Sequence, residues 1–284
     1  MDQRIIDLYD KFTHGAFNRR EFLERLAALA GSTAAAMALL PLLQNDYARA
    51  ETVAPDDPRL VTNTIYFNAS PTDVATYMAR PKEAKVCPAV IVVHENRGLN
   101  AHIKDIVRRL GLEGFAAYAV DLLSPEGGTP ADEDKARDMI AKLDPEQTTH
   151  NIDAAVRIFA RAPGGNGKAG LIGFCWGGGV VNRVAVLSAE LKAAVAYYGV
   201  QPPASDVPKI KAPLLLHYAG LDERVNAGIP AFEKALKANH KKYEIFVYPN
   251  VNHAFNNDTS NRYDKAAADL AWSRTIAFLK RELA

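Results

Sequence analysis

Cys175, one of only two cysteines in this chain, lies in the stretch GFCWGGG directly after the apolar run 169–172. The pattern G-x-C-x-G at a strand-to-helix junction predicts a sharp turn that presents the sulfur, as the G-x-S-x-G nucleophile elbow presents a serine. Unpaired N–H groups and the positive dipole end of the following helix would favour the reactive thiolate. A free cysteine is usually a small buried hydrophobe, but the glycine cluster around this one favours a nucleophile.

An acid and a base for this nucleophile follow later in the chain. Asp222 comes shortly after an apolar run that ends in a glycine turn, and His253 lies in the loop after the last β-rich run. Asp222 could instead be a helix cap or turn residue, the adjacent Glu223 could replace it, and His253 is one of seven histidines. The order nucleophile, acid, base is nevertheless that of α/β-hydrolases. It predicts a triad of Cys175, Asp222 and His253, in which the Gly-x-Asp step favours Asp222 over Glu223.

The stretch VHENRG at 93–98 is a candidate for completing the site. In α/β-hydrolases the loop after the corresponding strand supplies one backbone N–H of the oxyanion hole, and the residue after the nucleophile supplies the other. This assigns the backbone N–H groups of Asn96, or its neighbour, and of Trp176. His94 and Glu95 do not begin an H-E-x-x-H zinc helix, because position 98 is glycine.

The elements that must position these residues alternate along the chain from about residue 60. Short apolar strands separated by amphipathic helical patterns predict an α/β-hydrolase fold, with a mostly parallel sheet covered by helices on both faces. Functional residues are then expected at the carboxyl ends of the strands. Eight strands are expected, at 62–67, 74–79, 89–93, 116–120, 169–174, 193–198, 214–218 and 243–248, the first two joined by a turn at 71–73. Helices are expected at 101–113, 132–143, 148–161, 177–189, 228–239 and 264–282.

Composition narrows the function classes. The 284 residues are 48% hydrophobic and 24% charged with a net charge of +1, which predicts one α/β domain over 51–284 and no nucleic-acid partner. The two cysteines form no disulfide framework, and no Cys/His spacing suggests a zinc site. A bridge between Cys87 and Cys175 is not expected, because they should lie at opposite ends of neighbouring strands. The sequence therefore predicts neither a metal nor a cofactor.

The first 50 residues differ from the rest. The paired Arg19 and Arg20 precede a charge-free stretch at 26–43 and an A-x-A pattern at 48–50, which resembles a twin-arginine export signal. This interpretation predicts a periplasmic or secreted protein that meets the export machinery. The stretch is too weakly apolar for a stable membrane span. The alternative is a retained helical arm in a cytoplasmic protein, favoured by the long acidic segment before Arg19.

Four segments, in their order and at their intervals, resemble the dienelactone hydrolase family (carboxymethylenebutenolidase-like enzymes) over roughly residues 60–284. They are VVHENRG at 92–98, GFCWGGG at 173–179, LLHYAGLD at 215–222 and NHAF at 252–255. The resemblance implies the Cys175, His253, Asp222 triad. It also implies that Glu95 approaches the resting thiol and moves aside when substrate binds, leaving the thiolate paired with His253.

The sequence departs from the family pattern where those enzymes hold the substrate carboxylate with two arginines. The corresponding segments, 121–126 and 254–258, contain no arginine. Losing two charge-assisted contacts should weaken carboxylate recognition, so dienelactone itself is not the expected substrate. Arg97 could compensate, or it could form a surface salt bridge.

These observations favour a cofactor-free hydrolase that acts on small-molecule esters or lactones through a thiol ester on Cys175. Aromatic residues near the strand ends could line its acyl pocket or could simply pack in the core; they are Trp176, Tyr197, Tyr198 and Phe255. Two alternatives belong to other classes. One is a non-catalytic small-molecule binding protein with this fold, and the other is a redox-sensing thiol protein, for which no resolving cysteine is evident.

Overall fold

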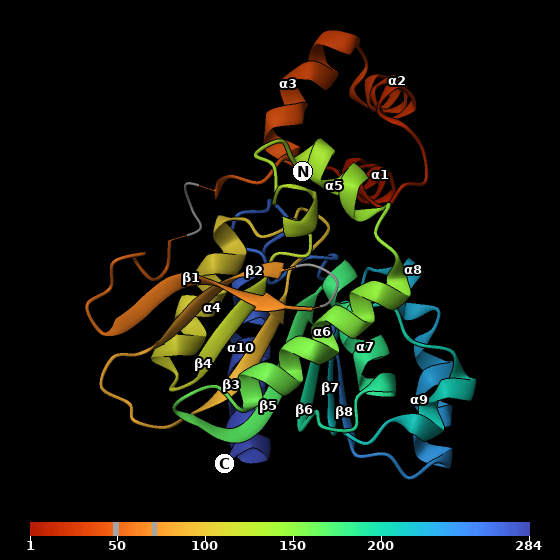
Figure 1. The fold of residues 1–284 in the computed structure, drawn as a ribbon. Coiled ribbons are helices and arrows are strands. Elements are labelled where there is room, and N and C mark those ends of the chain that lie inside the picture. The colour runs from red at the N-terminus through yellow and green to blue at the C-terminus, as the bar shows by residue number, and fades with distance from the viewer. Residues whose placement is uncertain (48–50, 70–72) are drawn as a thin grey trace.

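The computed structural model describes residues 1–47, 51–69 and 73–284. Its centre is an eight-stranded sheet in the order β1-β2-β4-β3-β5-β6-β7-β8 (Figure 1). The strands are β1 Leu60–Asn68, β2 Asp73–Pro81, β3 Cys87–Val93, β4 Ala116–Val120, β5 Gly165–Phe174, β6 Ala193–Tyr197, β7 Leu214–Ala219 and β8 Tyr243–Tyr248. All eight expected strands are present, with ends shifted by a few residues. Most of the turn expected at 71–73 lies outside the described residues.

The sheet is parallel from β4 to β8, and only the hairpin of β1 and β2 adds antiparallel pairs at one edge. Strands β4, β6 and β7 are buried along their whole length, because helices cover both sides of the sheet. This explains why they read as continuous apolar runs in the sequence. The parallel strands bring their carboxyl ends to one edge, where the predicted site residues lie.

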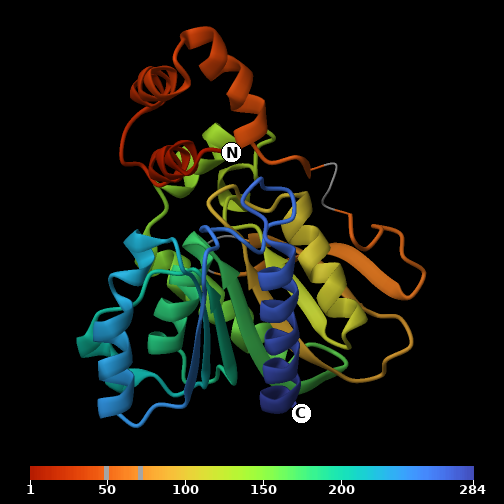
Figure 2. The same cartoon turned by 180° about the vertical axis from the view of Figure 1, so that it is seen from behind.

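Two helical layers cover the sheet. Helices α6 Pro145–Ala160, α7 Trp176–Leu187 and α9 Ile229–Ala238 lie on one face, and α4 Ala101–Leu112 and α10 Lys265–Leu283 lie on the other (Figure 2). The helices α5 Glu133–Ile140 and α8 Glu223–Asn226 follow strand ends at the carboxyl edge. The α/β-hydrolase fold expected from the sequence is thus confirmed.

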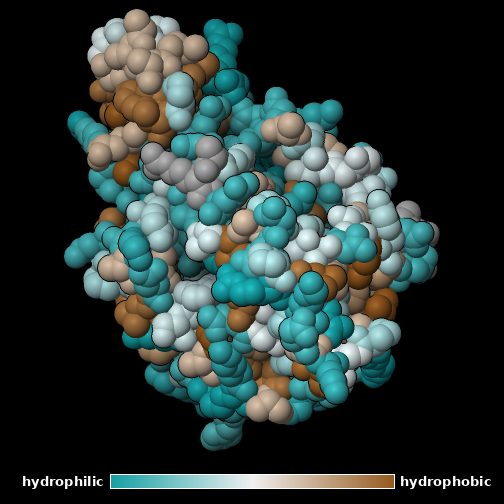
Figure 3. Space-filling model, turned by 90° about the vertical axis from the view of Figure 1, so that its left-hand side faces the viewer, coloured by the Kyte–Doolittle hydropathy of each residue, from teal (hydrophilic) through white to brown (hydrophobic). Residues whose placement is uncertain are grey.

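The first 43 residues form a three-helix arm with its own small core: α1 Gln3–Thr13, α2 Arg19–Ala30 and α3 Thr33–Leu43. Helix α2 begins with a capping box between Asn18 and Glu21, and it ends at Gly31 in the left-handed conformation with φ 84°. The rings of Phe12 and Phe22 stack with centroids 4.4 Å apart. The arm forms a lobe that stands out from the body (Figure 3).

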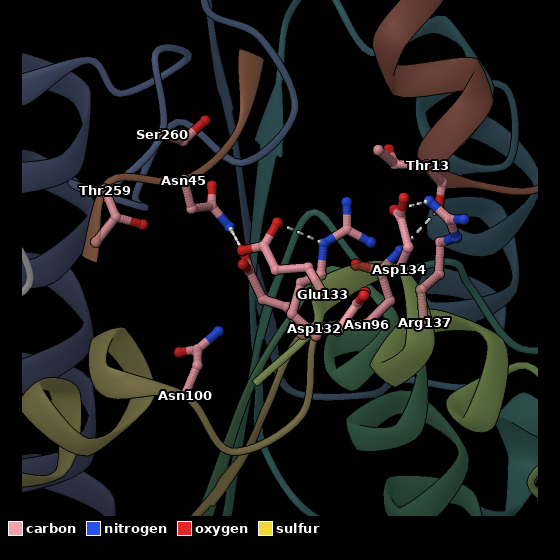
Figure 4. Close-up of polar contacts among 12 residues, drawn as sticks. Thr13, Asn45, Asn96, Asn100, Asp132, Glu133, Asp134, Arg137, Thr259 and Ser260 are labelled. Atoms are coloured by element: carbon pink, nitrogen blue, oxygen red, sulfur yellow. Dashed lines mark hydrogen bonds and ion pairs between the residues drawn. The ribbon is translucent and has the colours of Figure 1, made fainter. Parts of the chain in front are cut away.

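The arm docks on the carboxyl edge of the sheet mainly through polar contacts. Asn96 Nδ2 donates to the carbonyl of Thr13 at 2.8 Å, and Arg262 pairs with Asp10 at 2.8 Å. Behind α3, Asn45 Nδ2 donates to Glu133 of α5 at 3.0 Å; Figure 4 shows the two side chains facing each other. These contacts fix α1 directly above the predicted site.

The sequence features that suggested export lie in or next to the helical arm. Arg19 and Arg20 begin α2, and Arg19 forms an ion pair with Asp134 of α5. The A-x-A pattern at 48–50 lies outside the described residues. Within the described residues no single helix is long and apolar enough to cross a membrane. Helices α2 and α3 together have sufficient length and apolar composition, but the chain bends by 110° between them.

Candidate active site

Cys175 occupies a strained turn between β5 and α7. Its backbone has φ 55° and ψ −117°, a conformation that costs a non-glycine residue free energy and is typical of functional sites. The turn closes because its flanking residues are glycines: a Cβ on Gly173 would lie 2.4 Å from the carbonyl of Gly177, and one on Gly177 would lie 2.4 Å from the carbonyl of His94. The G-x-C-x-G pattern therefore builds the elbow that it predicts.

Asp222 and His253 meet in the loops after β7 and β8. Nδ1 of His253 donates to Oδ2 of Asp222 at 2.5 Å, and both side chains are buried. The other carboxylate oxygen of Asp222 accepts the backbone N–H of Val225 at 3.1 Å, so Asp222 also caps α8. Both interpretations of Asp222, cap and orienting acid, thus describe real contacts of the same side chain.

The sulfur of Cys175 has a second histidine beside it, which the sequence analysis did not identify. Nε2 of His14, directly after α1, lies 3.3 Å from Sγ. The ring of His14 is edge-on to that of His253, with centroids 4.8 Å apart. One ring nitrogen of each histidine and Sγ all lie within 4.8 Å of one another. Nε2 of His253 is buried and has no hydrogen-bonding partner among the described residues.

The electrostatics of this cluster favour charge separation. Burial alone would raise the pKa of the Cys175 thiol, but the positive charges of His253 and His14 lower it to about 6. Burial alone would lower the pKa of His253, but the negative charges of Cys175, Asp222 and Asp10 raise it to about 10. The arrangement therefore favours a thiolate paired with an imidazolium.

Glu95 is close to this cluster and is held away from the sulfur by two side chains. Oε2 accepts from Asn257 Nδ2 at 2.8 Å, and Oε1 accepts from the hydroxyl of Tyr198 at 3.4 Å. The contact between Glu95 and the resting thiol that the family resemblance implied is not among its hydrogen bonds. The side chain within hydrogen-bonding distance of Sγ in this structure is that of His14.

The remaining predicted residues lie around the site at different depths. Asn96 lines the same cavity as Cys175, and its side chain is bound to the arm. Trp176 stacks on His94 with centroids 5.6 Å apart and packs against the buried side chains of α5. Tyr198 packs its ring 4.9 Å from that of His253, and Phe255 packs behind Tyr198. The backbone assignments to an oxyanion hole stay a prediction.

The structure separates two of the predicted pocket residues: Tyr197 lies outside the cavity around Cys175, and Arg97 lines it. The Tyr197 hydroxyl is hydrogen-bonded to Thr275 of α10 at 2.7 Å, so this side chain packs between the sheet and α10 and is not part of the cavity around Cys175. Arg97 is buried, not at the surface, and its Nε lies 3.3 Å from Glu133. Its Nη1 atom is buried and has no partner among the described residues.

Two cavities adjoin the triad. A small one of about 20 Å³ lies among Cys175, His253, His14, Glu95 and Arg97 and has room for about one water molecule. A larger one of about 370 Å³ lies between α1 and the loops that carry Asp222 and His253. Cys175 lines only the small one, because the arm covers it.

Comparison with known proteins places this sequence in a family. The sequence model described as "Dienelactone hydrolase family" matches residues 74–283. This chain belongs to the dienelactone hydrolase family. Residues 1–31 match a second model, described as "YqhI-like".

Members of the dienelactone hydrolase family with similar sequences cover most of the body. A protein named "Putative carboxymethylenebutenolidase" from Escherichia coli O157:H7 is 34% identical over 224 residues, which cover 74% of this chain and 83% of the relative. A "Probable 2-oxo-3-(5-oxofuran-2-ylidene)propanoate lactonase" from Bradyrhizobium sp. is 30% identical over 73% of this chain and 89% of the relative.

A solved structure agrees with these sequence matches. The crystal structure of a putative dienelactone hydrolase from Klebsiella pneumoniae subsp. pneumoniae MGH 78578 superposes with a TM-score of 0.72 at 30% identity, covering 78% of this chain and 99% of that one. The shared part is long enough to include the whole sheet.

Proposed function

We propose that this protein hydrolyses carboxylic esters or lactones with Cys175 as nucleophile, His253 as acid and base, and Asp222 as the residue that orients His253. The observation that supports this best is the 2.5 Å contact between His253 and Asp222, with the free nitrogen of the same ring within 4.8 Å of a sulfur on a strained elbow. Family membership and the names of the two sequence relatives support the same reaction class.

The reaction follows from the charges of the site. The Cys175 thiolate attacks the carbonyl carbon, and the negative charge that develops on the carbonyl oxygen is stabilised by the backbone N–H groups of Asn96 and Trp176. The imidazolium of His253 gives its proton to the leaving oxygen as the C–O bond breaks, leaving a thiol ester. His253 then takes a proton from water, the hydroxide attacks the thiol ester, and the acid product leaves with the thiolate restored.

Substrate entry requires the arm to move in this account. The cavity beside Cys175 has about 20 Å³, enough for one water, whereas an ester or lactone group needs several times that volume. Arg97 and Arg262 both line this cavity. When α1 lifts, Arg262 loses its partner Asp10. We therefore expect the site to prefer substrates that carry an anionic group.

The test is hydrolysis of short p-nitrophenyl esters and simple lactones by the full-length protein and by Cys175→Ala. We expect loss of at least about 10³-fold in kcat/KM, because no other side chain can form the thiol ester. Cys87→Ala is the matched control: Cys87 is buried at the start of β3 and remote from the site, so its rate should be unchanged. A Cys175→Ala enzyme as fast as the wild type would remove the proposal.

Localisation is a separate proposal, which rests on the sequence alone. We propose twin-arginine export because of the order of the paired arginines, the charge-free stretch and the A-x-A pattern. Cleavage after residue 50 would remove His14 together with the arm. The intact mass of the protein recovered from the native cell tests the export proposal. A chain that starts near residue 51 supports cleavage, and a chain that starts at Met1 in the cytoplasm contradicts export.

A further inference from the structure

Three metal-ligand atoms from remote parts of the chain converge at the candidate site. They are Nε2 of His14 in the arm, Sγ of Cys175 at the elbow and Nε2 of His253 after β8. All three lie within 4.8 Å of one another, and the distance between His14 Nε2 and Sγ is 3.3 Å. The proton transfers of the hydrolysis mechanism use only His253, so His14 takes part in none of them.

Both imidazole rings are oriented by an acceptor at Nδ1, so each ring can bind a metal ion through Nε2 once Nε2 has lost its proton. Nδ1 of His14 lies 2.7 Å from the backbone carbonyl of Asp10 and 3.4 Å from its carboxylate. Since these oxygens only accept, Nδ1 carries the proton. Nδ1 of His253 donates to Asp222 in the same way. A carboxylate or carbonyl behind each ring is the usual support of a metal-binding histidine, and His253 Nε2 is buried with no partner among the described residues.

The separations are close to those of a tetrahedral zinc site. Zn–S bonds of about 2.3 Å and Zn–N bonds of about 2.0–2.1 Å place neighbouring ligand atoms about 3.3–3.6 Å apart. The distance from His14 Nε2 to Sγ is already 3.3 Å, and no two of the three ligand atoms are more than 4.8 Å apart. Binding of zinc would therefore need the ligand atoms to approach one another by about 1 Å or less on average. The adjoining cavity of about 20 Å³ has room for one water as the fourth ligand.

The donor set selects the kind of ion. One thiolate and two imidazoles suit borderline or soft transition metals such as zinc and cobalt, whereas magnesium and calcium prefer oxygen ligands. Glu95 and Asp222 bring buried carboxylates to this region, and Arg97 and Arg262 bring positive charges to the cavity, so the choice of ion rests on the donor atoms.

We propose that His14, Cys175 and His253 bind one divalent transition-metal ion of the zinc type, with water as the fourth ligand. No metal was expected from the sequence, because these three ligands come from separate segments and do not form a local spacing motif. Bound metal occupies both the nucleophile and the base, so it blocks hydrolysis while it ties the arm to the body. The arm then serves as a metal-dependent cover of the site.

The experiment is a titration of tag-free, full-length, metal-free protein with Co²⁺, followed by the thiolate-to-cobalt charge-transfer absorption, with Zn²⁺ as competitor. We expect one equivalent to bind and Zn²⁺ to displace it. Cys175→Ala should abolish the charge-transfer absorption. His14→Gln should weaken binding by about 100-fold or more, since loss of a supporting group alone costs 10–100-fold. His150→Gln, at an exposed histidine of α6, is the matched control and should bind like the wild type.

X-ray absorption of the zinc-loaded wild type gives a readout that does not depend on the folding of a variant. We expect one sulfur, two imidazole nitrogens and one further light atom around zinc. Absence of saturable binding, binding without sulfur, or equal affinity in His14→Gln and wild type would each overturn the proposal. If the protein binds metal but the metal-free enzyme does not hydrolyse esters, the proposed function is contradicted and the metal site is supported. If the enzyme hydrolyses esters but binds no metal, the metal site is contradicted and the proposed function is supported.

Discussion

The arm and the body are held together in different ways. The body buries two large apolar clusters, one on each face of the sheet, whereas the core of the arm contains eight buried apolar residues among those that the structure describes. The arm adds polar contacts to the carboxyl edge, such as the ion pair of Arg262 and Asp10. Asp222 and His253 therefore lie in the rigid part, and the cover of Cys175 lies in the part that can open at low cost.

This difference matters because some of the contacts that attach the arm are exposed and therefore weak, although the pair of Arg262 and Asp10 is largely buried. The side chains of Arg19 and Asp134 are 55% and 30% exposed, and ion pairs of this kind contribute about 0–1 kcal/mol. Loss of several such contacts lifts the arm without breaking the sheet. The body can thus keep its catalytic geometry while access to the sulfur changes.

The largest loss of activity is expected from a substitution in the body, at Asp222. Asp222→Asn keeps an oxygen that can cap α8 but removes the charge that orients and stabilises the His253 imidazolium. We expect kcat to fall by about 10²- to 10⁴-fold with the thermal midpoint close to that of the wild type. Asp222→Ala, which also loses the cap, should lose the same activity and in addition about 1 kcal/mol of stability. Activity of Asp222→Asn within a factor of a few of the wild type would argue against the orienting role.

An intermediate effect separates the two regions. Leu26 is fully buried in the arm, and Leu26→Ala should destabilise the arm by about 2–5 kcal/mol. We expect Cys175 to react faster with iodoacetamide while the thermal midpoint of the body stays unchanged. Leu110→Ala, at a fully buried leucine of α4, is the counterpart and should lower that midpoint. A common loss of stability in both variants would mean that arm and body unfold as one unit.

The smallest effect concerns a single docking contact. Asp134→Ala removes the ion pair with Arg19, together with the pair that Asp134 forms with Arg137 of α5, and leaves every candidate catalytic residue in place. We expect iodoacetamide labelling of Cys175 to rise by no more than about fivefold, corresponding to at most about 1 kcal/mol, and the difference to shrink at high salt. A large effect that is insensitive to salt would show that this contact does more than help to dock the arm.

Most of the body could be predicted because its signals are local. Continuous apolar runs follow from burial on both faces of the sheet, and the glycines around Cys175 follow from backbone contacts shorter than a Cβ allows. The order of nucleophile, acid and base then predicted which strand ends meet. Asp222 and His253 do meet, as expected from that order.

What the sequence did not predict depends on contacts between remote segments. His14 and Cys175 are 161 positions apart, and no periodicity links them; the one hint was that the segment before Arg19 is long for an export signal. Tyr197 is the last residue of β6, and Tyr198 directly after it has a positive φ of 39°, which no local pattern predicts. Only Tyr198 reaches His253. Arg97 is buried because Glu133 arrives from α5, a contact that no local pattern reveals.

The measurement that tests the central claim most directly is intact mass spectrometry of the full-length, metal-free protein quenched during turnover of p-nitrophenyl acetate, followed by peptide mapping. The account predicts one acetyl group, carried by Cys175 within the peptide that contains GFCWGGG, and its accumulation when His253 is replaced by Ala in an enzyme that still acylates slowly. Steady hydrolysis with no adduct on Cys175, or with the acetyl group on another side chain, would contradict the account.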